Sequence, residues 1–344
     1  MPKTLRNKYD EFLTKENLMK AHEQSQKGKR LRNNVIKFNL KKEEYIDWIY
    51  TQLKNRTYKH GTYKVFYVTE PKLRKIEASR YLDRVVHTWY VESFLKPYFL
   101  PQFIDTSYAC LQNRGTHRAA FKIQEFMKIC NKKWGEYYIL KMDVRKYFQN
   151  INKEKLMSII KKKIKDVDVL NLTKEIIYSK KDSTGIPIGN YTSQIFANIY
   201  LNELDQYIKH SLGVRHYVRF MDDAVILMEG KDKIKIVRKK IEDFLEKELK
   251  LTLNEKTNIF KNKQGVNFCG YQINEYRMKI RPRGKRKLKK KIAYLKYKIK
   301  TGQMSSLDAR KYLAGHNGYM KYANVNNLIN KLFYIIGKDD SPII

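Results

Sequence analysis

The stretch "YVRFMDDAVIL" at residues 217–227 decides the fold, because it places two adjacent aspartates between two runs of strand-forming residues. Aromatic and β-branched residues precede the pair, and the apolar run "AVIL" follows it. Short apolar runs of this kind favour strands, so we expect a hairpin whose tip carries Asp222 and Asp223. Two adjacent carboxylates repel each other, and a cation at the tip would relieve that repulsion.

The net charge is the most unusual property of the composition. The chain has 344 residues, of which 72 are Lys or Arg and 35 are Asp or Glu, so its formal net charge is +37. Charge repulsion of this size disfavours a compact protein on its own, which indicates a polyanion as the partner. A lysine-rich composition throughout is the alternative explanation, although the basic residues also cluster. No strongly amphipathic terminal helix accompanies the charge, which disfavours a membrane surface.

Length, hydrophobicity and cysteine content restrict the class of protein further. A hydrophobic fraction of 42% excludes a disordered chain, and the length allows two or three compact units. No stretch approaches the roughly 20 apolar residues of a membrane span, and the N-terminal segment has no apolar run of the signal-peptide type. Cys110, Cys130 and Cys269 are far apart and lack zinc-site spacing. We therefore expect free or buried thiols in a reducing cytoplasm.

Helical and strand patterns mix along the chain without strict alternation, which predicts the α+β class. We expect helices over much of residues 1–60, over 153–165, 193–210 and 232–249, and again from 284. We expect strands within 62–71, over 137–144, on both sides of Asp222, and around 266–273. In the last helical segment, one apolar stripe runs through lysine-rich sequence; it consists of Leu288, Ile292, Leu295 and Ile299.

A further candidate carboxylate lies in "ILKMDVRKYF", where Asp143 ends an apolar strand. The end of a strand and the tip of a neighbouring hairpin can bring carboxylates to one edge of a sheet. Mg²⁺ is held by one or two carboxylates together with substrate phosphates, and two such ions can flank a phosphorus atom. The alternative is a solvated hairpin tip, since Asp is a common turn residue.

These segments resemble the catalytic motifs of reverse transcriptases. "FMDD" is similar to the aromatic-x-Asp-Asp hairpin of the family, and "MDVRKYF" is similar to its first catalytic strand. "TGIPIGNYTSQIFANIYLNELD" (184–205) resembles the loop and helix that cradle the template and the incoming nucleotide.

The flanking segments resemble the remaining motifs of that family. "EPKLRKIEASRYLDRVVH" (70–87) resembles the finger motif that holds the triphosphate, and "DTSYACLQNRGTHRAA" (105–120) resembles a further finger segment. "LNEKT" followed by "VNFCGYQI" resembles the lysine motif and the primer grip. The motifs occur in the order of the family over roughly residues 55–325.

Within the family, the resemblance is strongest to the enzymes of diversity-generating retroelements. Ile188 stands before Gly189 where most relatives carry Gln, and Gln194 follows Ser193 where most carry Pro. "SYAC" with "GTH" downstream fits the same branch. A phage-defence or retron-like reverse transcriptase is an alternative, and an RNA-binding or maturase-like protein with a silent polymerase site is an alternative of another class.

The resemblance implies a right-hand polymerase with fingers, palm and helical thumb. It divides the chain into fingers at 1–135 with a basic N-terminal helical extension, a palm at 136–278 and a basic thumb at 279–344. The palm is expected to be an antiparallel sheet backed by helices, with its motifs around Asp143, Gly189, Asp222, Lys256 and Phe268.

The resemblance also implies the activity and the partners. The activity is DNA synthesis on an RNA template from dNTPs, error-prone at template adenines, with two Mg²⁺ ions or Mn²⁺ in their place. The partners are the template RNA, the primer or cDNA strand, and a basic oligomeric accessory protein. The protein is expected in the cytoplasm, and a bacterial or phage genome is expected to encode it.

The same resemblance assigns roles to individual residues. The expected metal ligands are Asp143, Val144, Asp222 and Asp223. Lys256 matches the lysine proposed to protonate the departing pyrophosphate; in a chain so rich in lysine, a surface lysine is the alternative.

The expected dNTP-binding residues come from the fingers and from the loop before residue 190. Arg74 matches the triphosphate-binding arginine, whose planar guanidinium donates two hydrogen bonds at once. The ring of Phe148 would clash with a 2′-hydroxyl, and Ile188 cannot hydrogen-bond the nucleotide. We therefore hypothesise that Ile188 lowers fidelity. The full set consists of Lys72, Arg74, Arg80, Phe148, Ile188, Gly189 and Gln194.

Two further groups of residues are expected to contact the nucleic acid. The primer grip consists of Phe268, Cys269, Gly270 and Tyr271. The lysine-rich helix of the thumb would neutralise phosphates of the duplex without reading its sequence. Its candidates are Lys285, Arg286, Lys289 and Lys290, and a solvated helix face is the alternative interpretation.

Overall fold

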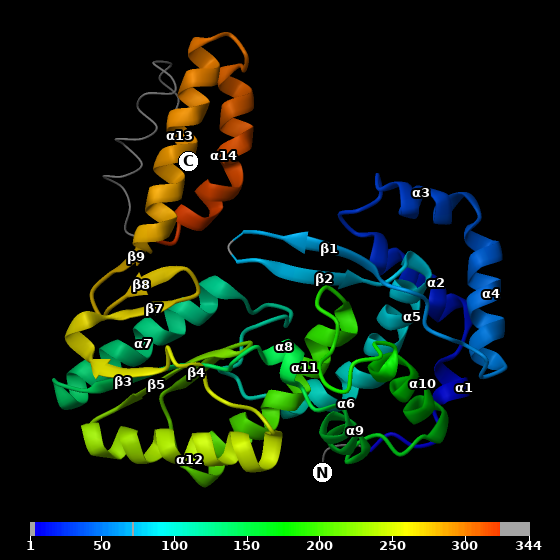
Figure 1. The fold of residues 1–344 in the computed structure, drawn as a ribbon, viewed down its shortest axis with the longest axis horizontal. Coiled ribbons are helices and arrows are strands. Elements are labelled where there is room, and N and C mark those ends of the chain that lie inside the picture. The colour runs from blue at the N-terminus through cyan, green and yellow to red at the C-terminus, as the bar shows by residue number, and fades with distance from the viewer. Residues whose placement is uncertain (1–3, 71, 324–344) are drawn as a thin grey trace. The chain divides into compact units, whose positions relative to one another are not determined.

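A computed structural model describes residues 4–70 and 72–323 (Figure 1). The chain divides into two compact units, each assembled from three segments. The first unit contains the described residues of 1–105, 143–215 and 239–256. The second contains the described residues of 106–142, 216–238 and 257–344. Pro71, expected to end a strand, and residues 324–344 of the predicted thumb lie outside the described residues.

The first unit is mainly helical. Its helices are α1 (Tyr9–Phe12), α2 (Lys15–Gln26), α3 (Asn33–Leu40), α4 (Lys42–Lys54), α5 (Tyr81–Tyr90), α6 (Lys96–Phe99), α8 (Tyr147–Asn150), α9 (Lys153–Lys161), α10 (Val167–Tyr178) and α11 (Tyr191–Gln206). Its strands β1 (Lys64–Val68) and β2 (Arg74–Ala78) form an antiparallel hairpin in which Phe66 faces Ile76.

The core of the first unit lies around α5 and α11. Trp89, Tyr90 and Phe196 are almost completely buried, and the rings of Tyr90 and Phe196 are in contact, with centroids 6.3 Å apart. Helix α11 is buried on nearly all sides, so its side chains fill the interior instead of forming one apolar stripe. The Tyr200 hydroxyl at its centre donates to the carbonyl of Leu249 at 2.6 Å.

The second unit contains two antiparallel arrangements of strands within its described residues. One sheet has the strand order β4-β5-β3-β6, and the other has the order β7-β8-β9. The strands are β3 (Tyr138–Asp143, of which Asp143 falls in the first unit), β4 (Tyr217–Phe220), β5 (Asp223–Met228), β6 (Asn258–Lys261), β7 (Val266–Phe268), β8 (Tyr271–Ile273) and β9 (Met278–Ile280). Helix α12 (Lys231–Leu249) begins in the second unit and ends in the first.

The helix α7 (Thr116–Trp134) covers the strands of the second unit and contacts β4, β5 and β8. Ile123, Met127 and Cys130 on one face of α7 pack into the same apolar core as Val218 and Val225. Their spacing of three and four residues is that of one helix face.

The helices α13 (Pro282–Lys300) and α14 (Ser306–Met320) pack against each other (Figure 1). Leu288, Ile292 and Leu295 are buried between them with Ala309 and Leu313, and Ile299 is partly buried in the same cluster. This confirms the apolar stripe predicted from the sequence. Lysines occupy most of the other positions of α13, and those sides of the helix are exposed.

The structure confirms the α+β class and the hairpin that carries Asp222 and Asp223. The sequence patterns did not indicate α5, α7 or α10, although each is well formed. Among the described residues, no helix combines the length and the hydrophobicity that a membrane span requires.

Candidate active site

The turn between β4 and β5 carries the two adjacent aspartates. Phe220 pairs with Asp223, so Met221 and Asp222 form the two-residue turn between the strands. Met221 has φ 57°, a left-handed conformation that costs a non-glycine residue about 1 kcal/mol or more. The side chains of both aspartates are half-buried. Gly or Asn would adopt this turn conformation with less strain than Met or Asp. A strained turn of this kind is typical of a functional position.

Lys141 in β3 supplies a cation that relieves the repulsion between the two carboxylates. Its ammonium group forms an ion pair with the carboxylate of Asp223. The same nitrogen lies 5.1 Å from the centre of the Phe268 ring. Lys141 stands two positions before Asp143 and therefore points to the same face of β3. The sequence analysis did not single out Lys141, although this period of two could have identified it.

Asp143 ends β3, which lies between β5 and β6 in the order of the sheet. Its carbonyl accepts a hydrogen bond from the backbone N–H of Asn254 at 2.7 Å. The next residue, Val144, is buried and forms an antiparallel bridge with Leu253. The backbone at the end of β3 is therefore fixed by the segment that precedes Lys256.

Carboxylate oxygens are hard donors of the kind that Mg²⁺ prefers, so the chemistry of the expected ligands fits that ion. The pairing of Asp223 with Lys141 shows that this carboxylate accommodates a cation. Within residues 4–70 and 72–323, no three His, Cys, Asp or Glu side chains are grouped closely enough to hold a metal ion. The metal-binding roles of Asp143, Val144, Asp222 and Asp223 stay predictions.

The finger residues expected to bind a triphosphate lie on or beside the β1–β2 hairpin. Arg74 is the first residue of β2, is exposed, and stands opposite Val68. Lys72 is also exposed. Arg80 occupies the N-cap position of α5 without a side-chain capping bond, and its guanidinium donates to the Thr62 hydroxyl at 2.7 Å. Arg74 is thus available to a phosphate, whereas Arg80 already has one partner.

The loop before α11 packs against the same hairpin. The carbonyl of Ile188 accepts from the N–H of Glu77 at 3.0 Å. Gly189 has φ +113°, and a Cβ added there would lie 2.8 Å from Cγ2 of Ile76. Only glycine fits this close approach, which explains the turn glycine in physical terms.

Phe148 and Gln194 belong to the same part of the first unit. Phe148 is half-buried, and its carbonyl accepts from the N–H of Ile186 at 2.9 Å. Gln194 is half-buried in the first turn of α11. The structure therefore ties the loop around residues 185–189 to both the Phe148 segment and β2.

The hairpin expected to grip the primer has a regular turn. Phe268 pairs with Tyr271, and both side chains are fully buried. Cys269 and Gly270 have φ 46° and 88°, two positive values as in the turns that match the twist of a hairpin. The Tyr271 hydroxyl bonds Nδ1 of His117 at 2.7 Å. Burial raises the pKa of the Cys269 thiol to about 12, so this thiol is not a nucleophile at neutral pH.

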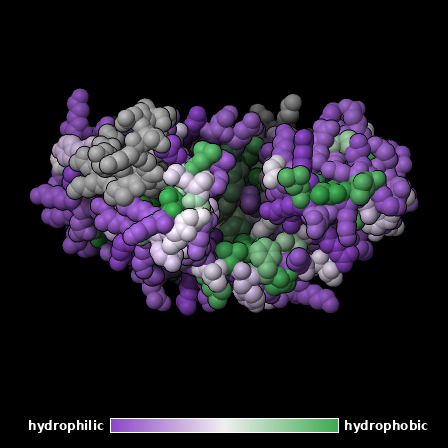
Figure 2. Space-filling view, turned by 90° about the horizontal axis from the view of Figure 1, so that it is seen from above, coloured by the Kyte–Doolittle hydropathy of each residue, from purple (hydrophilic) through white to green (hydrophobic). Residues whose placement is uncertain are grey.

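The remaining expected residues are basic and exposed. Lys256 lies in the segment before β6, where its backbone N–H donates to the side chain of Asn254 at 3.1 Å. The exposed residues of α13 include Lys285, Arg286, Lys289 and Lys290. Hydrophilic residues cover most of the face drawn in Figure 2. The contacts that the basic residues of α13 are expected to make with nucleic acid stay predictions.

Residues 58–273 match the family model described as reverse transcriptase (RNA-dependent DNA polymerase). The match covers more than half of the chain and contains Asp143, Asp222 and Lys256. The protein therefore belongs to the reverse transcriptase family.

The chain is also similar to two curated proteins of bacteria. It is 25% identical over 243 residues to Protein YkfC of Escherichia coli (strain K12), covering 59% of this chain and 63% of YkfC. It is 24% identical over 306 residues to the group II intron-encoded protein LtrA of Lactococcus lactis subsp. cremoris, covering 67% of this chain and 50% of LtrA. The chain thus spans between half and two thirds of the length of these relatives.

Similar solved structures include two telomerases. Telomerase from Candida albicans, in complex with the TWJ fragment of telomeric RNA, has a TM-score of 0.49 at 14% identity, over 75% of this chain and 55% of that chain. Apo telomerase from Candida tropicalis, truncated from the C-terminal domain, has a TM-score of 0.48 at 16% identity, over 64% of this chain and 55% of that chain.

Proposed function

We propose that this protein is an RNA-directed DNA polymerase that copies an RNA template into DNA from dNTPs. The observation that carries the proposal is the reverse transcriptase match over residues 58–273. The three aspartates expected to be catalytic all fall within that range. The similarity to a group II intron-encoded protein supports the same assignment.

In this proposal, Asp143, Asp222 and Asp223, with the carbonyl of Val144, hold two Mg²⁺ ions, or Mn²⁺ in their place. Asp143 is the last residue of β3 and Asp223 is the first residue of β5, so both carboxylates stand at strand ends. When bound, the metal ions would activate the 3′-hydroxyl of the primer and stabilise the charge on the reacting phosphate. Lys141 supports the proposal as well, because the carboxylate turn already holds one cation.

The other side chains of the proposed site bind and orient the substrates. Arg74, with Lys72 and Arg80 beside it, binds the triphosphate through charge-assisted hydrogen bonds. The ring of Phe148 excludes a 2′-hydroxyl and so selects deoxynucleotides. Lys256 donates a proton to the leaving pyrophosphate. The exposure of Arg74 and Lys256 supports these roles, because both can reach a ligand from solvent.

We further propose that the protein is a reverse transcriptase of the diversity-generating type and copies adenines with errors. Ile188 supports this proposal, because an aliphatic side chain cannot hydrogen-bond the nucleotide and so checks base-pair geometry less well. Replacing Ile188 with Gln is expected to reduce misincorporation opposite template adenine. An unchanged error rate in the Ile188→Gln variant would refute this role.

The organisation and partners proposed for such an enzyme follow the same resemblance. Fingers at 1–135, palm at 136–278 and thumb at 279–344 would enclose the template RNA and the primer or cDNA strand. A basic oligomeric accessory protein would be a further partner, and the cytoplasm would be the location. The exposed basic residues of α13 support contacts with the duplex, because lysines bind phosphates without reading sequence.

Primer extension on an RNA template tests the proposed activity. We expect dNTP incorporation by the wild type and a loss of about 1,000-fold or more in Asp222→Asn, since a metal ligand contributes several kcal/mol to the transition state. The matched control is Asp232→Asn, which removes an acid from an exposed position of α12. A silent RNA-binding protein would give no extension with the wild type, and that result would overturn the proposal.

The retron-like and phage-defence alternative is tested with the same protein. A reaction without an added primer is expected to give no product if the enzyme extends an external primer. DNA synthesis in that reaction would favour the alternative.

A further inference from the structure

Helix α7 has a second contact face beside its buried one. His117, Phe121 and Gln124 are spaced by four and three residues, so they lie on one side of the helix. His117 and Gln124 are half-buried, and Phe121 is exposed. The helix contacts β8 of the second unit (Figure 1). None of these three residues belongs to the active site proposed above.

This face of α7 holds the grip hairpin, which consists of β7 and β8. Nδ1 of His117 and the hydroxyl of Tyr271 in β8 form a hydrogen bond of 2.7 Å. Because Tyr271 is fully buried, loss of this bond would leave a polar group without a partner, which is unfavourable. The side-chain amide of Gln124 donates to the carbonyl of Asn274, the residue directly after β8, at 3.1 Å. Helix α7 therefore fixes the grip hairpin at two points.

The same face contacts the segment that follows α14, the second helix of the predicted thumb. The ring centroids of Tyr322 and His117 are 4.4 Å apart, with an angle of 36° between the ring planes. The ring of Phe121 meets Tyr322 edge-on at 5.7 Å. The next residue, Ala323, packs against the core beneath the strands and also against the cluster between α13 and α14. The end of the thumb helices therefore rests on α7.

The start of the thumb helices is attached to the grip hairpin directly. The N–H of Arg281, the residue before α13, donates to the carbonyl of Gly270 in the turn of the hairpin at 3.2 Å. Tyr271 also stands opposite Ile280 at the end of β9. Helices α13 and α14 are thus held at both ends, and His117 contacts both the grip hairpin and the segment after α14.

His117 differs from the core residues of the same helix. Ile123, Met127 and Cys130 lie in the apolar interior, where the main effect of a substitution is on stability. His117 is half-buried at the point where α7, β8 and the segment after α14 meet. Its contacts therefore determine how these three parts of the second unit are placed on one another.

We propose that His117 is a positioning residue that fastens the thumb helices to the grip hairpin and so sets how long the enzyme stays on a primer–template duplex. The inference rests on the polymerase activity proposed above, because the duplex is the substrate of that activity. Helices that are already held in place lose less entropy when they bind a duplex, and such differences appear mainly in the dissociation rate. Nucleotide addition itself uses no atom of His117.

Dissociation of a labelled RNA–DNA primer–template into an excess of unlabelled duplex tests the proposal. The full-length variants are Tyr271→Phe, which removes only a hydroxyl, His117→Phe, which keeps a ring against Tyr322, and the double variant. The matched control is Tyr276→Phe. It removes the same group from a tyrosine that is 79% exposed in the turn between β8 and β9.

We expect both single variants to release the duplex about threefold to tenfold faster than Tyr276→Phe, since a hydrogen bond to a buried group is lost. The double variant should be no faster than the faster single variant, because both changes remove the same bond. Release at the rate of the control in both single variants, or effects that multiply in the double variant, would overturn the proposal.

Single-turnover incorporation of one nucleotide separates positioning from chemistry. In His117→Phe we expect its rate at saturating dNTP to change by less than about twofold while the duplex is released faster. An incorporation rate that falls as far as the release rate rises would overturn the positioning role.

Tyr322→Leu tests the thumb side of the contact and, because Tyr322 is exposed, leaves the core intact even if Tyr271→Phe folds poorly. We expect about threefold faster release of the duplex, since a ring contact is lost. Release at the wild-type rate would show that His117 supports the grip hairpin alone, and would overturn its link to the thumb helices.

The release measurement needs binding but no catalysis, so the two proposals can fail separately. A wild type that holds the duplex but extends no primer would overturn the polymerase activity, and the release rates would still decide the role of His117. A wild type that does not bind the duplex would overturn both.

Discussion

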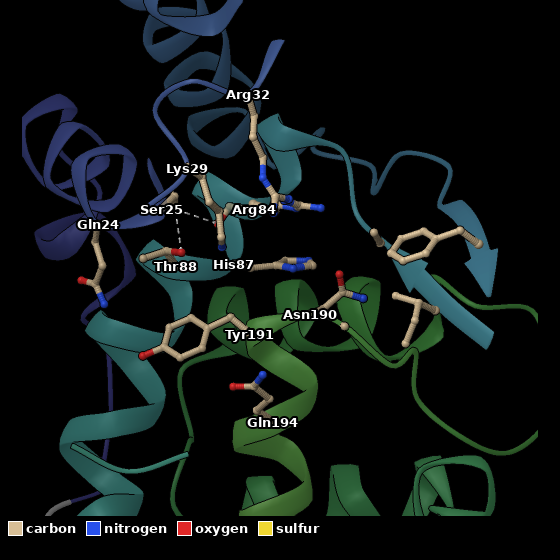
Figure 3. A pocket seen from close by; sticks show the side chains of 14 residues that line it. Gln24, Ser25, Lys29, Arg32, Arg84, His87, Thr88, Asn190, Tyr191 and Gln194 are labelled. Atoms are coloured by element: carbon tan, nitrogen blue, oxygen red, sulfur yellow. Dashed lines mark hydrogen bonds between the residues drawn. The ribbon is translucent and has the colours of Figure 1, made fainter. Parts of the chain in front are cut away.

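The aspartate turn in the second unit and a cationic pocket in the first unit differ in how their charges are neutralised. The pocket is lined by Lys29, Arg32 and Arg84 (Figure 3). At the turn, the carboxylate of Asp223 is neutralised inside the chain by Lys141. In the pocket, Lys29, Arg32 and Arg84 have no acid among the described residues. A turn with its own counter-charge can fold without a ligand. The cations of the pocket, of which Lys29 and Arg32 are exposed, have only solvent to screen them unless an anion binds. The comparison therefore predicts different responses to substitution and to ligands.

The largest effect is expected in the wall of the pocket. In Gly189→Ala, the new Cβ meets Cγ2 of Ile76 at 2.8 Å and the residue keeps φ +113°, so we expect a loss of about 2–3 kcal/mol in the free energy of unfolding. Gly28→Ala is the matched control, because Gly28 has φ +69° and no atom within 4 Å of an added Cβ. We expect a loss of about 1 kcal/mol there. Equal losses in urea unfolding would show that the wall is not tightly packed.

A smaller effect is expected at the turn. In EDTA, Lys141→Gln leaves the carboxylate of Asp223 without its cation, and we expect a loss of about 1–2 kcal/mol in the free energy of unfolding. Added Mg²⁺ should restore more stability to this variant than to the wild type, because the metal then supplies the missing positive charge. Lys233→Gln, which breaks an exposed pair with Glu229, is the control. A response to Mg²⁺ equal to that of the control would contradict the role of Lys141.

The smallest effect is the pH dependence contributed by His87, a buried residue that lines the same pocket. Burial lowers the pKa of His87 in the folded protein, so its stabilising contribution is complete above the ordinary histidine pKa and is lost as the pH falls below it. We expect His87→Phe to flatten the fall in stability between pH 7 and 5.5 by about 1 kcal/mol. The exposed His210→Asn variant is the control. A curve for His87→Phe that parallels the wild type would mean that the pKa of His87 is not lowered by folding.

The sequence could predict the aspartate turn because its evidence is local. Two strand-forming runs flank Asp222 and Asp223, and a hairpin needs no distant partner to be recognised. The period of two along β3 could also have identified Lys141, which shares a face with Asp143. Helix α7 was missed although Ile123, Met127 and Cys130 follow a helical spacing.

The pocket could not be predicted in the same way. Lys29, Arg84 and Asn190 come from three distant segments, and periodicity does not indicate which helices meet. Helix α5 has buried apolar residues at a helical spacing, such as Tyr81, Val85 and Trp89, so its helical pattern could have been recognised in the sequence. The surroundings of His87 could not, since only the fold shows that its ring nitrogens lack hydrogen-bond partners among the described residues.

The central claim is that Asp143 and Asp222 act together at one polymerase site, and single-turnover primer extension tests it most directly. Asp143→Asn, Asp222→Asn and the double variant are compared with the wild type on the same RNA template. Residues that act as a unit are strongly non-additive, so we predict a large loss in each single variant and no further loss in the double variant. A near-wild-type rate in either single variant, or losses that multiply in the double variant, would contradict the claim.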